Sequence, residues 1–295
     1  LKSSPVISER INRIVENPGA LNAYNYSEMK DEDDVDILLI TKNSLVTNFN
    51  DYVSFKESTG YHTEVITTET IFAAYTGQDN QEKIRNCIKD YYLNHNLGFV
   101  ILAGDADPNS SSDRIIPHRG LFAVDDDDIA SDMYYACLDG SWNNDGDNKW
   151  GETGEYDLYA EVGIGRICID NATEIANFTS KLKLYQNAPV VADIKKTLMV
   201  GEELNNNPPT YGDTYKEEIV DGTSINGFTT AGIPSGYQVS RLYDTQGGWD
   251  MYDVFQQFNV TGVNLLNHLG HSFVTYNMRM ETSNLTTTNF TNNGI

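Results

Sequence analysis

The sequence predicts an α/β fold of two adjacent subdomains with mostly parallel sheets, and three observations lead to it. Short apolar runs bounded by charges or glycine, such as residues 35–41, are typical of strands buried on both faces of a parallel sheet. Segments with apolar residues at helical spacing lie between these runs. The alternation starts again near residue 197, which predicts a second unit of the same kind.

The first subdomain is expected over residues 35–190, after a polar linker or pro-segment remnant at residues 1–34. Helical spacing of apolar residues predicts helices within this subdomain. A final helix is expected to start at Asn171, whose side chain caps it, and to stop before Pro189. The other expected elements are strands at residues 35–41, 63–67, 98–104 and 161–167 and helices at residues 45–56 and 81–94.

The second subdomain is expected over residues 191–295 and repeats the strand–helix alternation. Its apolar runs are short and follow polar or turn-forming residues, as strands of a parallel sheet do. The expected elements are strands at residues 197–201, 237–243 and 263–267 and helices at residues 213–220 and 249–258.

Composition excludes several classes of function. The chain of 295 residues carries 20 basic and 43 acidic side chains, a formal net charge of −23, which argues against nucleic-acid binding and against docking on anionic lipid. No apolar run is long enough to insert into a membrane. Three cysteines without a Cys-x-x-Cys pair exclude a disulfide scaffold and a zinc ribbon.

Titratable side chains follow two predicted strands of the second subdomain. Glu202 and Glu203 come after residues 197–201, and the sequence 267–272, with His268 and His271, comes after residues 263–267. Reactive groups gather at the carboxyl ends of strands in open α/β sheets. A carboxylate can fix the tautomer of a nearby imidazole, which then exchanges protons near neutral pH. A histidine at a strand end can also simply bind a loop, so spacing alone leaves both readings open.

Several segments together resemble the gingipain-type cysteine peptidases, peptidase family C25. Residues 267–272, Asn-His-Leu-Gly-His-Ser, are similar to the catalytic-histidine motif Asn-Tyr-x-Gly-His-Gly of that family. The other matching segments occur in the order of the family, over roughly residues 33–290: Leu-Ala-Gly-Asp at 102–105, Ile-Pro-His-Arg at 116–119, Ser-Asp-Met-Tyr-Tyr at 131–135 and Glu-Val-Gly-Ile-Gly-Arg-Ile at 161–167.

The resemblance implies a caspase-like fold and cleavage of polypeptides by a cysteine thiolate. It assigns His271 as the acid that protonates the leaving amine and Glu202 as the residue that orients it, with Glu203 as the alternative. Gly270 precedes the histidine, as in the family, and its N–H is a candidate oxyanion donor. Ser272 departs from the usual glycine, which weakens the assignment of the oxyanion site.

The nucleophile is the largest departure from the family pattern. In the family it lies a few tens of residues after the histidine, but no cysteine follows His271 here. Cys87, Cys137 and Cys168 all precede it and are interpreted as small buried hydrophobic residues. We therefore expect the nucleophile just beyond residue 295 and expect this fragment alone to be inactive.

Asp213 is a candidate for the base of the primary specificity pocket. In the Arg-cleaving members an Asp lies about a dozen residues after the acid of the triad, and Asp213 follows Glu202 at a similar spacing. A buried carboxylate there would pair with a substrate Arg or Lys. The competing interpretation is that Asp213 is the N-cap of the following helix, a position that Asp favours.

Residues 141–152 predict one structural calcium ion. Asn143, Asp145, Asp147 and Glu152 alternate as hard oxygen ligands around Gly146, in the manner of an EF-type loop. Ser141 and Lys149 are poor ligands at the remaining positions, so Asp139 is expected to supply the missing one. A solvated acidic loop is the alternative reading.

Together these features predict most of the catalytic domain of a secreted or cell-surface, calcium-stabilised cysteine endopeptidase. Its partners would be polypeptide substrates, and its oligomeric state is undetermined. Two alternatives stay open. One is a catalytically dead peptidase fold that serves as a calcium-binding module of a larger surface protein. The other is a caspase-fold peptidase with a different specificity.

Overall fold

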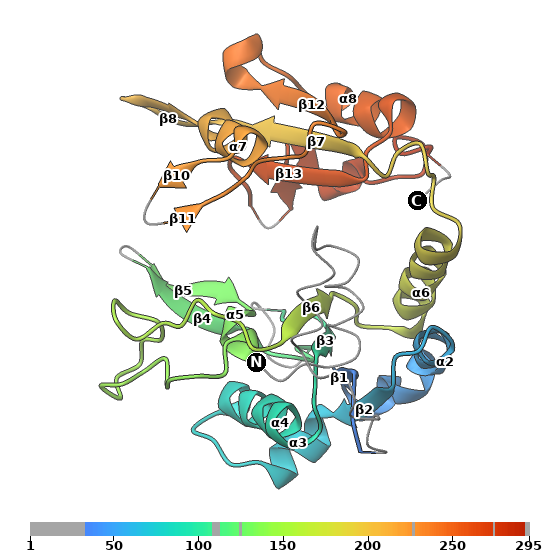
Figure 1. The fold of residues 1–295 in the computed structure, drawn as a ribbon, viewed down its shortest axis with the longest axis vertical. Coiled ribbons are helices and arrows are strands. Elements are labelled where there is room, and N and C mark those ends of the chain that lie inside the picture. Colours follow the sequence, from blue (N-terminus) through green and yellow to red (C-terminus); the bar gives the residue numbers. More distant parts are fainter. Residues whose placement is uncertain (1–32, 108–112, 124–125, 226–227, 274, 293–295) are drawn as a thin grey trace, which may run out of the picture. The chain divides into compact units, whose positions relative to one another are not determined.

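The computed structural model describes residues 33–107, 113–123, 126–225, 228–273 and 275–292. The chain forms two compact units, Leu1–Ser180 and Lys181–Ile295. Their boundary falls inside helix α6 (Ala172–Asn187), earlier in the chain than the predicted boundary at residue 190. Both units are α/β, with parallel main sheets (Figure 1). Residues 1–32 of the predicted linker lie outside the described ranges.

Four parallel strands in the order β2-β1-β3-β6 form the sheet of the first unit. They are β1 (Ile37–Thr41), β2 (Thr63–Thr67), β3 (Phe99–Ala103) and β6 (Gly163–Ile167), close to their predicted ranges. Every residue of β1 is buried, because helices cover both faces of the sheet. Leu39 lies opposite Val65 on β2 and Ile101 on β3.

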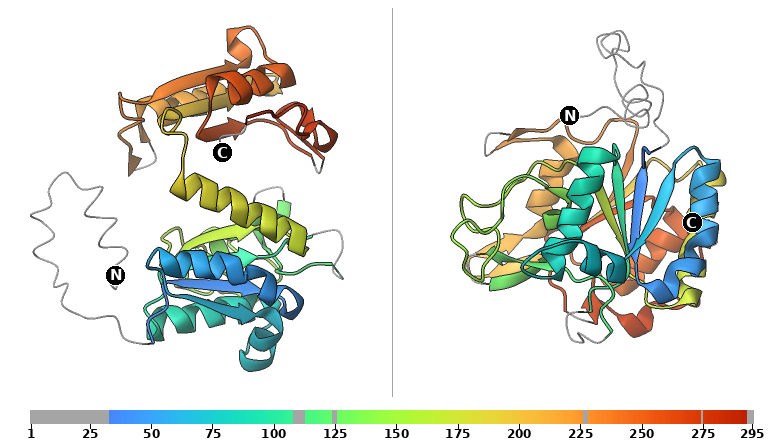
Figure 2. Two further views of the ribbon diagram at one scale, coloured as in Figure 1. Left: turned by 90° about the vertical axis from the view of Figure 1, so that its right-hand side faces the viewer. Right: turned by 90° about the horizontal axis from the view of Figure 1, so that it is seen from below.

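The helices of the first unit lie on both faces of this sheet (Figure 2). Helix α2 (Asn50–Ser58) and the start of α6 share one face, where the rings of Tyr52 and Phe178 have centroids 6.4 Å apart. Helices α3 (Thr68–Ala74) and α4 (Asn80–Asn94) lie on the other face. The helix predicted at residues 45–56 is divided into a 3₁₀ segment, η2 (Asn43–Phe49), and α2, and α3 was not predicted.

One arginine joins four of the segments that carried the family resemblance, its own and three others. The guanidinium of Arg166, on β6, donates to both carboxylate oxygens of Asp132 at 2.7 and 2.8 Å. It also donates to the carbonyls of Gly104 and Ile116 at 2.9 and 2.8 Å. A bidentate pair with added carbonyl acceptors is a strong, directional contact. These motif residues therefore hold together the long segment between β3 and β6, which contains the hairpin β4 (Arg119–Ala123) and β5 (Asp126–Ser131) and helix α5 (Met133–Ala136).

The second unit has a parallel sheet with the order β12-β7-β13. The strands are β7 (Lys196–Gly201), β12 (Gln238–Tyr243) and β13 (Leu265–Leu269). Helix α7 (Gly212–Asp221) packs on β7 and β13, close enough that a Cβ on Gly212 would lie 2.3 Å from the carbonyl oxygen of Leu269. Three hairpins complete the unit: β8 (Glu203–Asn206) with β9 (Pro209–Tyr211), β10 (Ser224–Ile225) with β11 (Phe228–Thr229), and β14 (Tyr276–Asn277) with β15 (Met280–Glu281).

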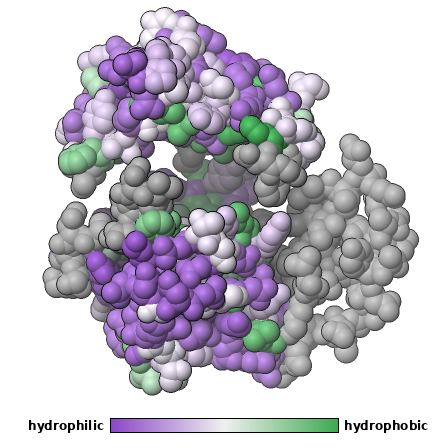
Figure 3. Space-filling view, turned by 90° about the vertical axis from the view of Figure 1, so that its left-hand side faces the viewer, coloured by the Kyte–Doolittle hydropathy of each residue, from purple (hydrophilic) through white to green (hydrophobic). Residues whose placement is uncertain are grey.

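A compact core lies on one face of β7. Leu198 and Val200 pack there with Trp249 and with residues of helix α8 (Met251–Gln256), which continues into a π-helical turn, η4 (Gln257–Thr261). The outer surface is mostly hydrophilic with separate hydrophobic patches in the view of Figure 3, in keeping with the net charge of −23. Within the described ranges, no helix combines the length and hydrophobicity needed to cross a membrane.

Candidate active site

Polar side chains gather at the carboxyl edge of the second sheet. After β7 the chain proceeds to β12 on one side and then returns to β13 on the other, so the strand order reverses at β7. Glu202 follows β7, Asp244 follows β12, and His268 and His271 lie in or just after β13. Such a reversal point is where open α/β sheets bind ligands. The predicted gathering of titratable groups is therefore present in this unit.

The carboxylate of Glu202 is paired with His268, whereas the family resemblance implies His271 as its partner. Oε1 of Glu202 lies 2.9 Å from Nε2 of His268, and the two side chains are only 8% and 12% exposed. An ionised carboxylate can only accept a hydrogen bond, so Nε2 of His268 carries the proton. The backbone N–H of Glu202 donates to the carbonyl of Leu269 at 3.0 Å, which fixes β7 and β13 at the same level.

Gly270 lies against this pair. A Cβ on Gly270 would be 2.4 Å from Cδ of Glu202 and 2.5 Å from Nε2 of His268. No side chain fits without moving one of them, so the close approach of the backbone requires glycine. This contact explains the glycine of the motif by packing, independently of the oxyanion role expected for its N–H.

The imidazole of His271 is exposed and is fixed by the main chain. Its Nε2 lies 3.0 Å from the carbonyl oxygen of Leu204, on strand β8. A carbonyl only accepts, so Nε2 bears the proton in the neutral ring and Nδ1 is the basic nitrogen. The ring borders an open cavity of about 450 Å³, which is also lined by residues 203–207.

Neither histidine is hydrogen-bonded or ion-paired to Glu203 among the described residues. Its side chain is exposed, and its backbone N–H donates to Oδ2 of Asp244 at 2.8 Å. Of the two adjacent acids that the sequence left open, the structure therefore brings only Glu202 to a histidine of the motif.

Asp213 is buried, at 5% exposure, in the first turn of α7. Its interpretation as the N-cap is wrong, because Tyr211 occupies that position and Asp213 lies inside the helix. The carboxylate accepts the N–H of Thr214 at 2.9 Å and the hydroxyl of Thr245. Asp213 forms no ion pair with any residue in the part of the chain that the structure describes. The N-terminal end of the helix dipole favours its negative charge.

The three cysteines lie in the first unit and differ in exposure. Cys87 and Cys137 are buried and Cys168 is exposed, so the interpretation of all three as buried residues is wrong for Cys168. Burial raises the pKa of the Cys87 thiol to about 12 and that of the Cys137 thiol to about 11. Asp157 and Glu161 add to the shift at Cys137 by charge repulsion. An activated cysteine nucleophile has a lowered pKa, so these two thiols are not activated.

The predicted calcium ligands fall into two separate groups. The carboxylates of Asp145, Asp147 and Glu152 converge, with their ligand atoms within 4.8 Å of one another. The side chain of Asn143 bonds within the loop, accepting from the N–H of Gly146 at 2.9 Å and donating to the carbonyl of Asp147 at 2.7 Å. Partial desolvation and repulsion from Asp147 raise the pKa of Glu152.

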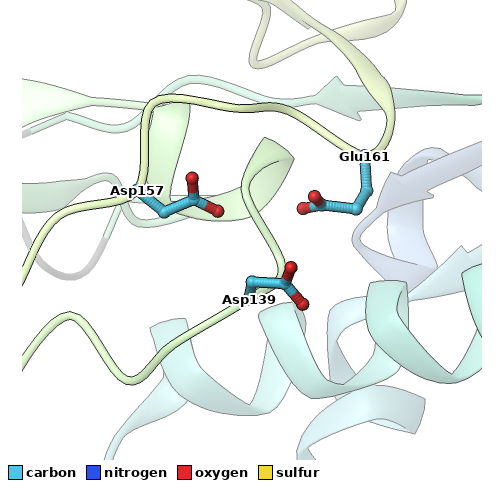
Figure 4. A group of neighbouring side chains, drawn as sticks. All are labelled: Asp139, Asp157 and Glu161. Carbon is cyan, nitrogen blue, oxygen red and sulfur yellow. The ribbon is translucent and has the colours of Figure 1, made fainter. Parts of the chain in front are cut away.

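Asp139 belongs to a second group, with Asp157 and Glu161, and their carboxylates point toward one another (Figure 4). Oδ2 of Asp157 is buried without a hydrogen-bond partner among the described atoms, and Glu161 accepts the N–H of Leu138 at 2.5 Å. Hard carboxylate oxygens at this spacing suit calcium better than a softer metal. Asp157 and Glu161 are absent from the predicted set, because they lie outside the EF-type loop of residues 141–152.

The second unit thus carries a buried carboxylate–imidazole pair and an exposed, backbone-anchored imidazole at the carboxyl edge of a parallel sheet, which defines an acid–base site on an α/β fold. The model of peptidase family C25 matches residues 30–294, and the chain belongs to this family. Its fold is caspase/gingipain-like.

Solved structures agree on the fold. One is described as "Complex of Porphyromonas gingivalis RgpB pro- and mature domains"; it is 20% identical, with a TM-score of 0.56, and the match covers 84% of this chain and 51% of that one. Another, described as "Structure of Protease", is 18% identical, with a TM-score of 0.55 and coverage of 86% and 49%. The chain therefore spans about half the length of these structures. The search of curated protein sequences gave no match.

Proposed function

We propose that this chain is most of the catalytic domain of a secreted cysteine endopeptidase in which His271 is the acid–base residue. The observation that carries the proposal is the anchoring of an exposed imidazole in the family's histidine motif by the Leu204 carbonyl. The nucleophile is assigned to a cysteine beyond residue 295, since residues 181–295 contain none. The fragment without that cysteine is inactive in this proposal.

The chemistry then follows the tautomer of His271. Nδ1, the basic nitrogen, takes the proton of the thiol, and the thiolate sulfur attacks the peptide carbonyl. The C–N bond breaks as the protonated imidazole gives its proton to the leaving amine, and water later hydrolyses the thioester. The N–H of Gly270 is assigned to the oxyanion. Glu202 acts indirectly, because its pair with His268 fixes the start of the β8 segment whose carbonyl orients His271.

The test uses the protein extended past residue 295 and a set of fluorogenic peptides. His271→Ala is expected to reduce hydrolysis by a factor on the order of 10²–10⁴. His62→Ala, an exposed histidine in the first unit, is the matched control and should leave the rate unchanged. Long-range ¹H–¹⁵N spectra should show the proton of neutral His271 on Nε2, and a proton on Nδ1 would contradict the mechanism.

We further propose that Asp213 binds a substrate Arg or Lys. A buried carboxylate without a cationic partner among the described residues supports this assignment. In the extended protein, Asp213→Asn should lower kcat/KM for peptides with Arg or Lys before the scissile bond by a factor of roughly 10 to 1000. Asp221→Asn, at the exposed other end of α7, is the control. Equal rates for Asp213→Asn and the parent would refute the assignment and leave a peptidase of different specificity.

We also propose that one structural calcium ion binds the loop of Asp145, Asp147 and Glu152. Three converging carboxylates repel one another unless a cation compensates them. Calcium at about 100 times its Kd should raise Tm by about 5–10 °C. Asp147→Asn should abolish this shift and Asp157→Asn should retain it. The reverse result would place the ion at the group of Asp139, Asp157 and Glu161 instead.

The alternative function, a catalytically dead calcium-binding module, predicts a different experimental result. Both readings allow the calcium-dependent rise in Tm, but only the peptidase hydrolyses peptides. If the extended protein shows no hydrolysis and His271→Ala changes nothing, the module becomes the better explanation.

A further inference from the structure

The turn of the β14–β15 hairpin carries an arginine with an unusual number of contacts. NH2 of Arg279 lies 2.7 and 2.8 Å from the two carboxylate oxygens of Asp244, and NH1 donates to the carbonyl of Trp249. The guanidinium also lies over the ring of Trp249, 4.3 Å from its centroid. A carboxylate, a carbonyl and an aromatic face together are a complete guanidinium-binding site.

The backbone of this turn is in a conformation that its residues disfavour. The loop of the hairpin consists of Met278 and Arg279, with φ of 49° and 59°. Two-residue hairpin loops with positive φ normally contain Asn and Gly. Such a conformation persists only where surrounding contacts impose it. Met278 packs against the core of the unit, and Arg279 makes the contacts above, so the side chains hold the turn.

The partners of Arg279 lead directly to the residues around Glu202. Asp244 also accepts the backbone N–H of Glu203 at 2.8 Å. The indole N–H of Trp249, which is 6% exposed, points to the carbonyl of Gly201 at 3.4 Å. The residues on either side of Glu202 are thus joined to the hairpin that follows His271 through one guanidinium.

We propose that Arg279 is a positioning residue that fixes the segment after His271 relative to Glu202 and strand β8. The role deepens the proposed function, since it concerns the geometry of the same site. The guanidinium does not touch the imidazole, so its effect passes through the hairpin and through Asp244. Lysine does not reproduce this set of contacts, because only the planar guanidinium reaches the Asp244 carboxylate and the Trp249 carbonyl with two different nitrogens while it stacks on the indole ring.

Hydrogen exchange measured by mass spectrometry on this chain tests the proposal without requiring activity. Arg279→Ala should speed exchange at least about tenfold in residues 275–281 and at the amide of Glu203, while β7 and β12 stay protected. Arg241→Ala is the matched control, because Arg241 pairs with Glu217 in the same unit at 2.7 and 3.0 Å. It should leave residues 275–281 unchanged.

Chemical rescue separates positioning from general destabilisation. Ethylguanidinium added to Arg279→Ala should restore slow exchange in residues 275–281, and ethylammonium at the same concentration should not. Arg279→Lys should behave like Arg279→Ala. Uniformly faster exchange across the unit, or no rescue by ethylguanidinium, would overturn the proposal. In the extended protein, Arg279→Ala should lower kcat more than it changes KM. Hydrogen exchange and its rescue do not depend on peptidase activity. A failure of the proposed peptidase function can therefore be told apart from a failure of the positioning role of Arg279.

Discussion

Gly270→Ala perturbs the site where the backbone lies against the pair of Glu202 and His268. The added methyl would lie 2.4 Å from Cδ of Glu202 and 2.5 Å from Nε2 of His268, a separation that real Cβ atoms essentially never show. Overpacking of this kind costs about 1–3 kcal/mol. Separating the buried carboxylate from its imidazole costs about 1–3 kcal/mol more. We expect the free energy of opening of the second unit to fall by about 2–6 kcal/mol.

Native-state hydrogen exchange of amides in β7 and β13 measures this quantity for the second unit alone. A loss of 2 kcal/mol corresponds to exchange faster by about 30-fold. Gly236→Ala is the control, because Gly236 lies in the same unit and its Cβ would meet only the end of the Lys195 side chain, at 3.7 Å. Both variants share the effect of alanine on the unfolded chain, so their difference isolates the clash.

Two results would refute this reasoning. The first is a Gly270→Ala variant that exchanges within twofold of Gly236→Ala. The second concerns coupling: His268→Ala removes one of the two clashing groups, so adding Gly270→Ala to it should cost less than in the parent chain. Equal costs in both backgrounds would show that the methyl does not contact the pair.

Two further predictions concern the thiols and an ion pair. Iodoacetamide at pH 8 should modify Cys168 quickly and should spare Cys87 and Cys137, whose thiols are buried and have a raised pKa, as followed by peptide mass spectrometry. Hydrogen bonds from Arg241 lower the pKa of Glu217, so this pair stabilises the fold above the ordinary glutamate range and loses its effect as pH falls through the lowered pKa. Arg241→Ala should therefore lower the free energy of unfolding by under about 1 kcal/mol at pH 7, since the side chains of Arg241 and Glu217 are both about one-third exposed. The loss should be smaller near pH 3, and urea unfolding at both pH values measures it.

Much of the fold follows from periodicity alone. Residues 37–40 are all apolar because β1 is buried on both faces, and the same reasoning locates β3 and β7. Elements without a periodic pattern of apolar residues cannot be predicted in this way. Helix α3 is short, and the hairpins β8–β9 and β14–β15 have strands of only two to four residues. Their positions depend on side-chain contacts from distant segments, such as the pair of Arg279 and Asp244.

The sequence predicts at which edge of the second sheet the candidate site lies, but it does not predict which histidine pairs with Glu202. The sequence shows which residues follow β7 and β13, and the family motif singles out His271. Which imidazole reaches Glu202 depends on the pleat and register: His268 lies opposite Val200 on β7, directly beside the strand end that bears Glu202. His271 lies beyond the end of β13, next to β8. A shift of one residue in register decides on which face of a sheet a side chain lies, and the composition of the chain carries no information about the register.

The two histidines of this segment therefore bind different partners, Glu202 and the main chain of β8. Where the motif usually has tyrosine, His268 takes the carboxylate of Glu202, and the carbonyl of Leu204 orients His271. A carbonyl selects the Nε2–H tautomer as firmly as a carboxylate does, but it stabilises the imidazolium less, because it bears no full charge. Replacing His268 by the tyrosine of the family motif would give Glu202 a phenol in place of the imidazole. If Glu202 acts on His271 only through the backbone, the ring ¹⁵N resonances of His271 in the His268→Tyr variant should keep their parent positions in NMR spectra. Displaced resonances would mean that Glu202 had turned toward His271, and would refute the indirect role of the carboxylate.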